Sequence, residues 1–278
     1  ISGGVTLNSS GSHGSVEFGT SASTLKLVTV NAGNGITVNG DLTTSSSATF
    51  NADSDGSGVG DFSIDASTTL STGNNSLTLT ANDVTVSGSI SSGTGSTTIA
   101  VSDGGTIGLG GTSGNMTITG TELGNITAGT LNIGDSSTGN ITVDGISAAN
   151  SNNVTTVSLT TASGSSTSFS NNDSTFNALT SNGGSTSFGS GLTIATDTGK
   201  LSIDSASMTS AGALTLTGAT GIDFGAGVTF TAGGDLTMST TSGDIEGGGA
   251  FTLTSTGDIS LSENLTTAGA TVITADSD

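Results

Sequence analysis

The sequence predicts an all-β protein, a right-handed parallel β-helix (β-solenoid) of about 12 coils with about 22 residues per coil. Two observations predict this fold. Short stretches alternate apolar and polar residues, and these stretches return at a nearly constant spacing. A parallel β-helix needs both features, because each coil contributes short strands that pair with the strands of the next coil.

The predicted strands are short and strictly alternating. Two apolar residues are separated by one small polar residue at 77–79, 84–86, 141–143, 214–216 and 251–253. A period of two is typical of a strand with one buried face. Gly, Asn, Asp and Ser follow most of these stretches and favour turns. No stretch repeats its apolar residues with the period of a helix, so we expect almost no helix.

The spacing between strands defines the coil. Val228, Phe251 and Ile273 are separated by 23 and 22 residues, and each interval holds three short strands. One coil cannot bury its apolar side alone, whereas stacked coils share a continuous core. The usual handedness of parallel crossovers makes the helix right-handed. The residues expected to point inward are Val5, Leu7, Leu77, Leu79, Val84, Val86, Ile141, Val143, Leu214, Leu216, Phe251, Leu253, Ile259 and Leu261.

The chain also repeats at long range. Residues 41–55 return as 264–278, an offset of 223 residues, and residues 4–7 return with the same offset. Self-similarity at a fixed period indicates a repeat protein. We interpret residues 1–55 as the carboxy-terminal-equivalent part of a preceding module, and residues 56–278 as one further module of about ten coils. We therefore expect a segment of a longer protein, with neighbouring modules or other copies stacked end to end.

The composition argues against several classes of function. The chain has 2 Lys, no Arg and 22 acidic residues, and its formal net charge is -20. Because phosphate binding needs basic residues, we expect no nucleic-acid partner. No stretch reaches the ~18 consecutive apolar residues of a membrane helix, so we expect no membrane insertion. Proline is absent, which fits a chain whose backbone is paired almost everywhere.

Residues 161–191 are less regular, because Ser, Thr, Asn and Gly dominate them. The sequence around Phe169 nevertheless recurs around Phe188, 19 residues later. The segment forms either shorter coils, with one Phe stacked above the other, or a flexible linker.

The sequence predicts no catalytic residues, and we expect no enzyme activity. Proton transfer would depend on carboxylates such as Asp244 and Glu246, which fall at turn positions that every coil offers. His13 has no second His or Cys to complete a metal site.

One motif resembles a calcium-binding loop. The predicted Ca²⁺ ligands are the side chains of Asp53, Asp55, Ser57 and Asp61 and the carbonyl of Val59, at loop positions 1, 3, 5, 9 and 7. Gly58 takes the sharp-turn position between them. Ile64 stands where such loops carry a bidentate Glu, so an unliganded acidic turn is the alternative. The motif begins again at Asp276, which implies one loop per module.

The phrase at 257–270, with strands of the Asp-Ile-Ser-Leu and Asn-Leu-Thr-Thr type between Gly-rich turns, resembles the repeats of very large secreted bacterial proteins. These are the filamentous-haemagglutinin-type adhesins and related autotransporter-like surface proteins. The resemblance covers most of the chain as a pattern. It implies a β-helical rod displayed on the outside of a Gram-negative-type bacterium. The secretion domain of that family carries Asn-Pro motifs, and this chain has no proline.

We expect a structural segment of a long extracellular fibre, such as an adhesin stalk, surface filament or sheath. The alternative is a module that binds carbohydrate or ice through rows of threonine on a flat face, with host or environmental glycans as partners. Such a face would align Thr in coil after coil, whereas the outward residues here mix Thr with Ser, Asn, Asp and Gly.

Overall fold

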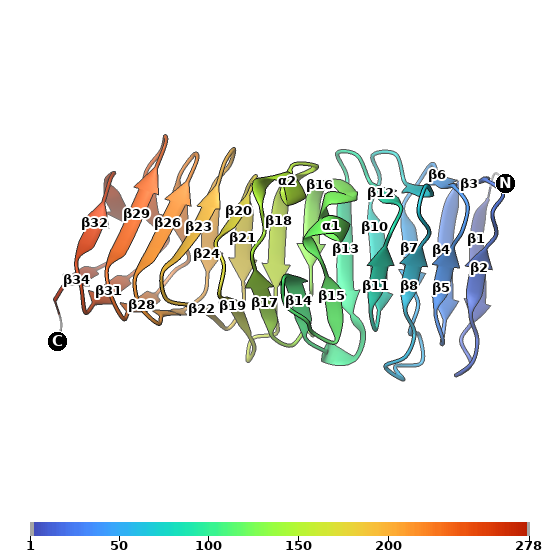
Figure 1. Cartoon of the computed structure of the whole chain (residues 1–278), viewed down its shortest axis with the longest axis horizontal. Coiled ribbons are helices and arrows are strands. Elements are labelled where there is room, and N and C mark those ends of the chain that lie inside the picture. The colour runs from blue at the N-terminus through green and yellow to red at the C-terminus, as the bar shows by residue number, and fades with distance from the viewer. Residues whose placement is uncertain (1–2, 277–278) are drawn as a thin grey trace.

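The computed structural model describes residues 3–276 of the chain. It is an elongated stack of coils that runs from the amino-terminal to the carboxy-terminal end (Figure 1). All strand pairs between coils are parallel, and the stack contains about 12 turns with a spacing of about 22 residues. The predicted fold class, a parallel β-helix, is confirmed.

One sheet, which we call sheet A, contributes a strand to every coil. It keeps its place through the whole stack, from β1 to β33. Its strands are β1 (Gly4–Ser9), β4 (Leu27–Ala32), β7 (Ala48–Asn51), β10 (Leu77–Ala81), β13 (Ser96–Val101), β16 (Ile126–Ile133), β18 (Val154–Thr160), β21 (Leu179–Asn182), β24 (Leu201–Asp204), β27 (Ile222–Phe224), β30 (Ile245–Gly247) and β33 (Leu265–Thr267).

In the first four coils the chain passes from sheet A to sheet B and then to sheet C. Sheet B consists of β2 (Val16–Phe18), β5 (Ile36–Val38), β8 (Phe62–Ile64) and β11 (Val84–Val86). Sheet C consists of β3 (Ser23–Leu25), β6 (Leu42–Thr44), β9 (Thr69–Ser71) and β12 (Ser89–Ser91), and it joins sheet A through β16.

In the second half the other two sides are formed by sheets D and E. Sheet D contains β15 (Met116–Ile118), β14 (Ile107–Gly110), β17 (Ile141–Asp144), β19 (Ser166–Phe169), β22 (Ser185–Phe188), β25 (Ser207–Ser210), β28 (Val228–Ala232), β31 (Phe251–Ser255) and β34 (Thr271–Thr274). Sheet E contains β20 (Ser174–Phe176), β23 (Leu192–Thr196), β26 (Leu214–Gly218), β29 (Leu236–Thr240) and β32 (Ile259–Leu261).

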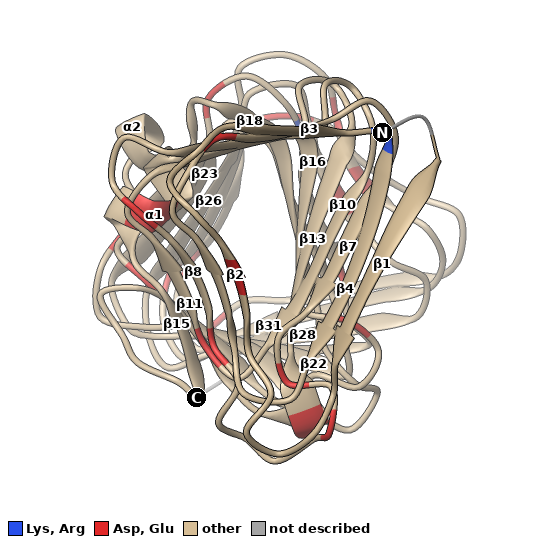
Figure 2. Cartoon of the chain, turned by 90° about the vertical axis from the view of Figure 1, so that its right-hand side faces the viewer, with Lys and Arg blue, Asp and Glu red and all other residues tan. Residues whose placement is uncertain are grey.

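Within residues 3–276, short helices interrupt the strands only in the middle of the rod. A 3-10 turn at Ser102–Gly104 precedes β14, while α1 (Gly120–Gly124) and α2 (Ala148–Ser151) stand at the outside of the stack (Figure 2). A capping box closes the start of α1, because the Thr119 hydroxyl accepts from Glu122 N and Glu122 Oε2 accepts from Thr119 N.

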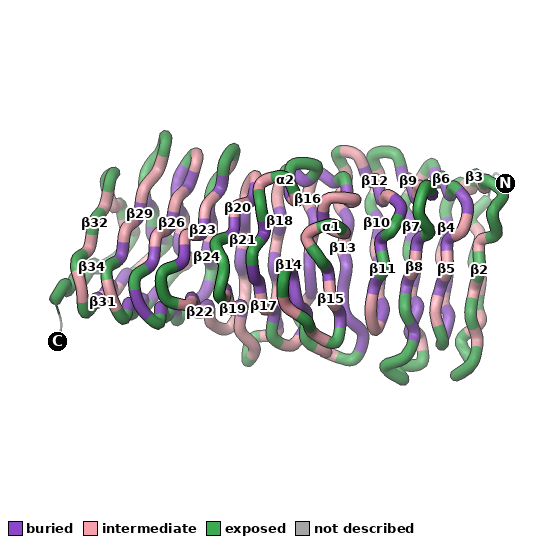
Figure 3. The backbone as a smooth tube through the Cα atoms, viewed as in Figure 1, coloured by how far each residue is buried: buried purple, intermediate pink, exposed green. Residues whose placement is uncertain are grey.

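A single apolar core fills the interior along the axis, and Figure 3 shows its buried positions alternating with outward ones. Ten of the predicted inward residues are buried: Leu77, Leu79, Val84, Val86, Ile141, Val143, Leu214, Leu216, Phe251 and Leu253. Val5, Leu7, Ile259 and Leu261 are only half-buried, because they belong to the outermost coils of the described stack.

The less regular segment at 161–191 forms regular coils rather than a linker. Phe169 and Phe188 stack with ring centroids 5.3 Å apart and an interplanar angle of 12°. The same coils also carry inward hydroxyls where other coils carry aliphatic groups. Thr167, Ser181 and Thr186 are each at most 1% exposed. The core of this region is therefore partly polar.

The 223-residue repeat keeps its strand register in the structure. Val5 pairs with Val28 and Val28 with Ala48, and the residues 223 positions later pair in the same way, from Val228 to Phe251 to Thr271. The first set lies in sheet A and the second in sheet D. Our expectation of ten whole coils per module is therefore wrong: one repeat moves an equivalent strand to the next side of the coil.

Candidate functional sites

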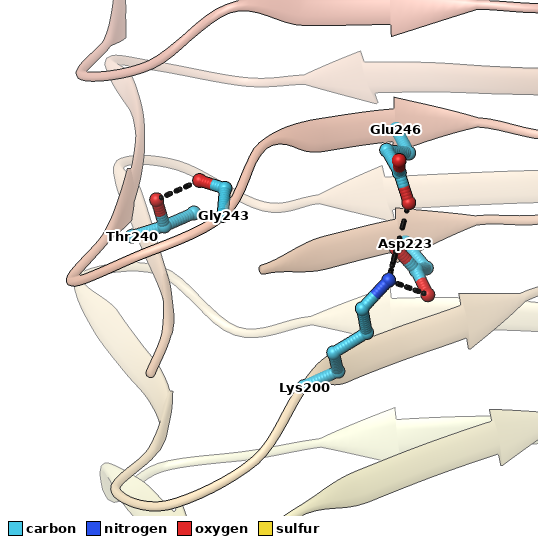
Figure 4. A network of polar contacts seen from close by, with 5 residues as sticks. All are labelled: Lys200, Asp223, Thr240, Gly243 and Glu246. Carbon is cyan, nitrogen blue, oxygen red and sulfur yellow. Dashed lines mark hydrogen bonds and ion pairs between the residues drawn. The ribbon is translucent and has the colours of Figure 1, made fainter. Parts of the chain in front are cut away.

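One ion-pair network lies on the outer surface of sheet A (Figure 4). Lys200 Nζ lies 2.9 and 3.0 Å from the two carboxylate oxygens of Asp223 and 3.1 Å from Glu246 Oε2. Asp223 and Glu246 are direct neighbours on β27 and β30, and Lys200 immediately precedes β24. The three residues therefore occupy successive coils on the same side of the rod.

The network neutralises a repulsive pair. Like charges that stand opposite each other on paired strands destabilise a sheet. The hydrogen bond and charge of Lys200 lower the pKa of Glu246. The hydrogen bonds to Asp223 and Glu246 raise the pKa of Lys200 in turn. All three N–H donors of the ammonium have an acceptor within the protein, so the network is satisfied without a ligand.

Two shallow hollows flank this network. One, of about 430 Å³, is lined by Asp223, Glu246, Thr266 and neighbouring small residues. The other, of about 450 Å³, lies on the side of Lys200 and is lined mostly by Thr, Ser and small residues. The hollows share Asp223 as a lining residue.

The sequence analysis did not identify Lys200, Asp223 and Glu246 as a group. Their spacing carries the signal, since 23 residues separate each from the next. That interval is one coil, and it stacks outward residues as well as inward ones.

The predicted calcium loop connects β7 with β8 and is built around a buried carboxylate. Asp53 is 3% exposed. Its Oδ1 accepts from Ser57 N at 2.9 Å and from the Ser57 hydroxyl at 3.2 Å. Its Oδ2 accepts from Gly58 N at 2.9 Å and from the Ser102 hydroxyl at 2.6 Å. These four donors use about all of the lone-pair positions at which a carboxylate can accept hydrogen bonds.

These hydrogen bonds determine the titration of Asp53. Burial raises its pKa, but the bonds from Ser102, Ser57 and Gly58 outweigh burial, so the pKa of Asp53 is lowered from 3.8. Asp135 is bonded in the same manner to Ser137 and Thr138, and its pKa is lowered for the same reasons. Gly58 has a φ of +73°, which agrees with the predicted sharp turn.

Of the remaining predicted ligands, only Ser57 bonds to Asp53. Asp55, Ser57 and Val59 are exposed, and Val59 keeps 56% of its surface. Asp61 Oδ1 accepts from Asn82 Nδ2 and from Asp83 N in the following coil, both at 3.1 Å. Among residues 3–276, no group of three or more His, Cys, Asp or Glu side chains could hold a metal ion. The return of the motif at Ser277 and Asp278 lies outside the described residues. The calcium site stays a prediction.

Rows of hydroxyl groups run along the outside of sheet D. Strand register aligns Thr209, Thr231, Thr254 and Thr274 in one row, and it aligns Ser207, Thr229 and Thr252 in a second row two residues earlier. The grid has spacings of ~4.8 Å between strands and ~6.6 Å along a strand. Aligned Thr residues are therefore present on this side, although the sequence analysis expected mixed outward residues.

Comparison of the chain with protein-family models, curated proteins and solved structures finds no match. Within the described part of the chain, no helix has the length and apolar character needed to cross a membrane. The structure agrees with a repetitive β-helix protein, which is the coarse part of the resemblance noted in the sequence.

Proposed function

We propose that this chain is a structural segment of a long extracellular fibre or filament, such as an adhesin stalk, and that it performs no catalysis. The observation that carries the proposal is the unbroken core, in which each coil packs on its two neighbours from one end of the stack to the other. A fold of this kind lengthens by adding coils without changing its cross-section.

The polar groups that first suggested chemistry support the same proposal. Asp53 has its donors within the loop and the next coils, and Lys200 has its acceptors on two successive strands. These groups join consecutive coils rather than facing a substrate. The acidic surface, with a net charge of -20, keeps such rods apart in solution and repels anionic partners.

We propose neighbouring modules or other copies of the chain as partners, stacked end to end. The motivating observation is the 223-residue repeat, which keeps its strand register within one continuous stack. Repeated units of this kind stack on one another and share a continuous core. Nucleic acid and membrane lipid are not proposed as partners.

The proposed location is the cell surface of a Gram-negative-type bacterium, on the pattern of the filamentous-haemagglutinin-type adhesins. An antibody raised against the chain tests both location and form. We expect immunogold labelling of filaments outside intact source cells, and about 12 coils should occupy roughly 55–60 Å of filament length. Labelling confined to the cytoplasm, or of discrete globular particles, would contradict the proposal.

The hydroxyl rows on sheet D favour one second candidate, a module that binds carbohydrate or ice. A regular grid of Thr hydroxyls can order water or face a polysaccharide surface. The test is ice recrystallisation inhibition, together with co-sedimentation with insoluble polysaccharides. Replacing Thr231 and Thr254 by Tyr should abolish either activity, while the same change at Thr215 and Thr237 on sheet E serves as the control. No activity in the native chain rejects this candidate and leaves the fibre proposal standing.

A further inference from the structure

One side of the rod contains a break between two sheets. β11 ends sheet B and β15 ends sheet D, and the two strands lie side by side without strand pairing. At the same level, sheet A pairs β10 with β13 and β13 with β16 without interruption. We call the contact between β11 and β15 the seam.

Side chains replace the missing backbone ladder at the seam. Asp83 Oδ1 accepts from Thr117 N of β15 at 2.8 Å. Glu122 Oε1 accepts from Val86 N of β11 at 3.1 Å, and Asn125 Nδ2 donates to Val86 O at 2.8 Å. Three side chains thus satisfy backbone groups that a paired strand would satisfy elsewhere in the stack.

One side of the seam belongs to residues 111–125, which include β15 and α1. We call this segment the flap. Glu122 belongs both to the capping box of α1 and to the seam, because its Oε2 accepts from Thr119 N while its Oε1 accepts from Val86 N. Beyond the seam, β15 pairs only with β14, over three residues. Apart from the seam contacts, the flap is held by this pairing and by Met116, Ile118 and Leu123, which are fully buried in the core.

The extra strand also makes the seam side longer than the opposite one. From β11 the chain stacks β15, β14 and β17, whereas sheet A covers the same interval with β13 and β16. One additional strand adds ~4.8 Å to one side of the rod. Close packing of the extra strand favours a longer seam side, whereas continuous pairing in sheet A keeps the opposite side shorter. The two sides of the rod therefore favour different lengths at this level.

The seam carries negative charge, and no basic group of the described residues acts on Asp83 there. The charged groups that act on Asp83 are Asp61, which precedes β8, and Glu122 of α1. Burial raises the pKa of Asp83, and the charges of Asp61 and Glu122 raise it further against the effect of two backbone hydrogen bonds. The folded chain therefore destabilises the ionised form of Asp83 relative to an exposed carboxylate.

We propose that the seam is a built-in joint: the flap at 111–125 lifts from β11 while sheet A stays paired, and the rod bends there before any other coil opens. The joint acts by local opening of a unit that side chains, instead of a backbone ladder, join to the preceding coil. It does not depend on the fibre proposal, because it concerns the isolated chain.

Hydrogen exchange on the whole chain tests the joint, with peptides from 84–86 and 116–118 compared with peptides from 77–81 and 97–101 in the same coils. We expect the seam peptides to exchange at least about tenfold faster. Glu122→Ala should increase that difference, and Glu17→Ala in sheet B is the matched control. Equal protection in the two sets of peptides, or faster exchange in sheet A, overturns the proposal.

Measuring hydrogen exchange as a function of pH tests whether charge repulsion at Asp83 opens the seam. A raised carboxyl pKa contributes stability that is present at low pH and is lost as the pH rises through that pKa. After correction for intrinsic exchange rates, the seam should therefore close as the pH falls through the raised pKa of Asp83 toward its ordinary value of 3.8. Asp83→Asn, neutral at every pH, should keep the seam closed at pH 7 and remove the pH dependence. A pH dependence that persists in this variant overturns the electrostatic part.

Discussion

The Nζ atom of Lys200 lies 3.1 Å from Oε2 of Glu246, which follows it by 46 residues and two coils. Lysine spans the intervening coil with its side chain and reaches Asp223 on the way. In a chain with two basic residues, one of them thus joins three successive coils of the rod.

We expect Lys200→Met to destabilise the surrounding coils slightly and in a salt-dependent manner. The change leaves Asp223 and Glu246 facing each other without a counter-ion, and like charges on paired strands repel. Because the groups are largely exposed, screening by salt should remove most of the effect. Thermal unfolding at low and high ionic strength measures it, with Lys26→Met as the control. A loss that is unchanged in high salt would contradict the electrostatic origin.

A charge inside the stack should have a far larger effect. Leu216 is fully buried, so Leu216→Asp places an unpaired carboxylate in the core at a cost of several kcal/mol, in order of magnitude. Since the inward side chains of a coil pack mainly against the adjacent coils, loss of exchange protection should stay within those coils. Thr215→Asp, one residue earlier on the outward face, is the matched control. Uniform loss of protection along the whole rod would argue against nearest-neighbour stability.

The sequence predicts the fold well because one physical rule covers the whole chain. Leu77 and Leu79 alternate with polar residues, and the same alternation returns in each coil, so period two and period 22 together define both strand and stack. The break beside Val86 could not be foreseen in this way. Residues 102–125 lack the coil spacing, and the partner of Val86 N is Glu122, 36 residues away.

The candidate site was predicted less well than the fold. The spacing around Asp53 indicated a loop with a sharp turn at Gly58, which the structure contains. The spacing could not reveal that the hydroxyl of Ser102, 49 residues later, accounts for one acceptor position. Contacts between residues of different coils depend on how the strands of those coils are aligned. A short sequence motif carries no information about that alignment.

Acid should loosen the Asp53 loop. Its lowered pKa means that the folded loop gains stability above pH 3.8, the ordinary value, and loses that stability as the pH falls through the pKa of the folded state. Asp53→Ala should remove this part of the acid sensitivity and cost about 1–3 kcal/mol at pH 7, because backbone and hydroxyl donors lose their acceptor. Urea unfolding at pH 7 and at lower pH measures both effects. Asp55→Ala, an exposed neighbour, should change neither.

Calcium binding by the same loop has a sharp test. A cation at Asp53 must displace donors such as Ser102, so Ser102→Ala should bind Ca²⁺ more tightly than the native chain. Isothermal titration calorimetry at millimolar Ca²⁺ compares the two proteins. The absence of heat in both, together with a melting temperature that a chelator leaves unchanged, rejects the site and leaves Asp53 as the residue that closes the turn.

The partly polar core at 161–191 offers the last prediction. The buried hydroxyl of Ser181 has no hydrogen-bond partner, and its neighbours in sheet A are Leu159 and Ile203. Removing an unsatisfied buried hydroxyl relieves a desolvation penalty of about 1–3 kcal/mol, so Ser181→Ala should leave the melting temperature unchanged or raise it. Thr186 differs, because its hydroxyl bonds Ser205 at 2.8 Å.

Thr186→Val keeps the shape of the side chain but leaves the hydroxyl of Ser205 without this partner, so it should destabilise the chain by about 1 kcal/mol or more. The two variants each change one side chain of the same coil by a few atoms and should have different effects on the melting temperature. Equal destabilisation by both would show that packing rather than hydrogen bonding limits this part of the core. Exchange protection at 179–182 and 185–188 would then fall together, whereas the hydrogen-bond account predicts a fall only for Thr186→Val.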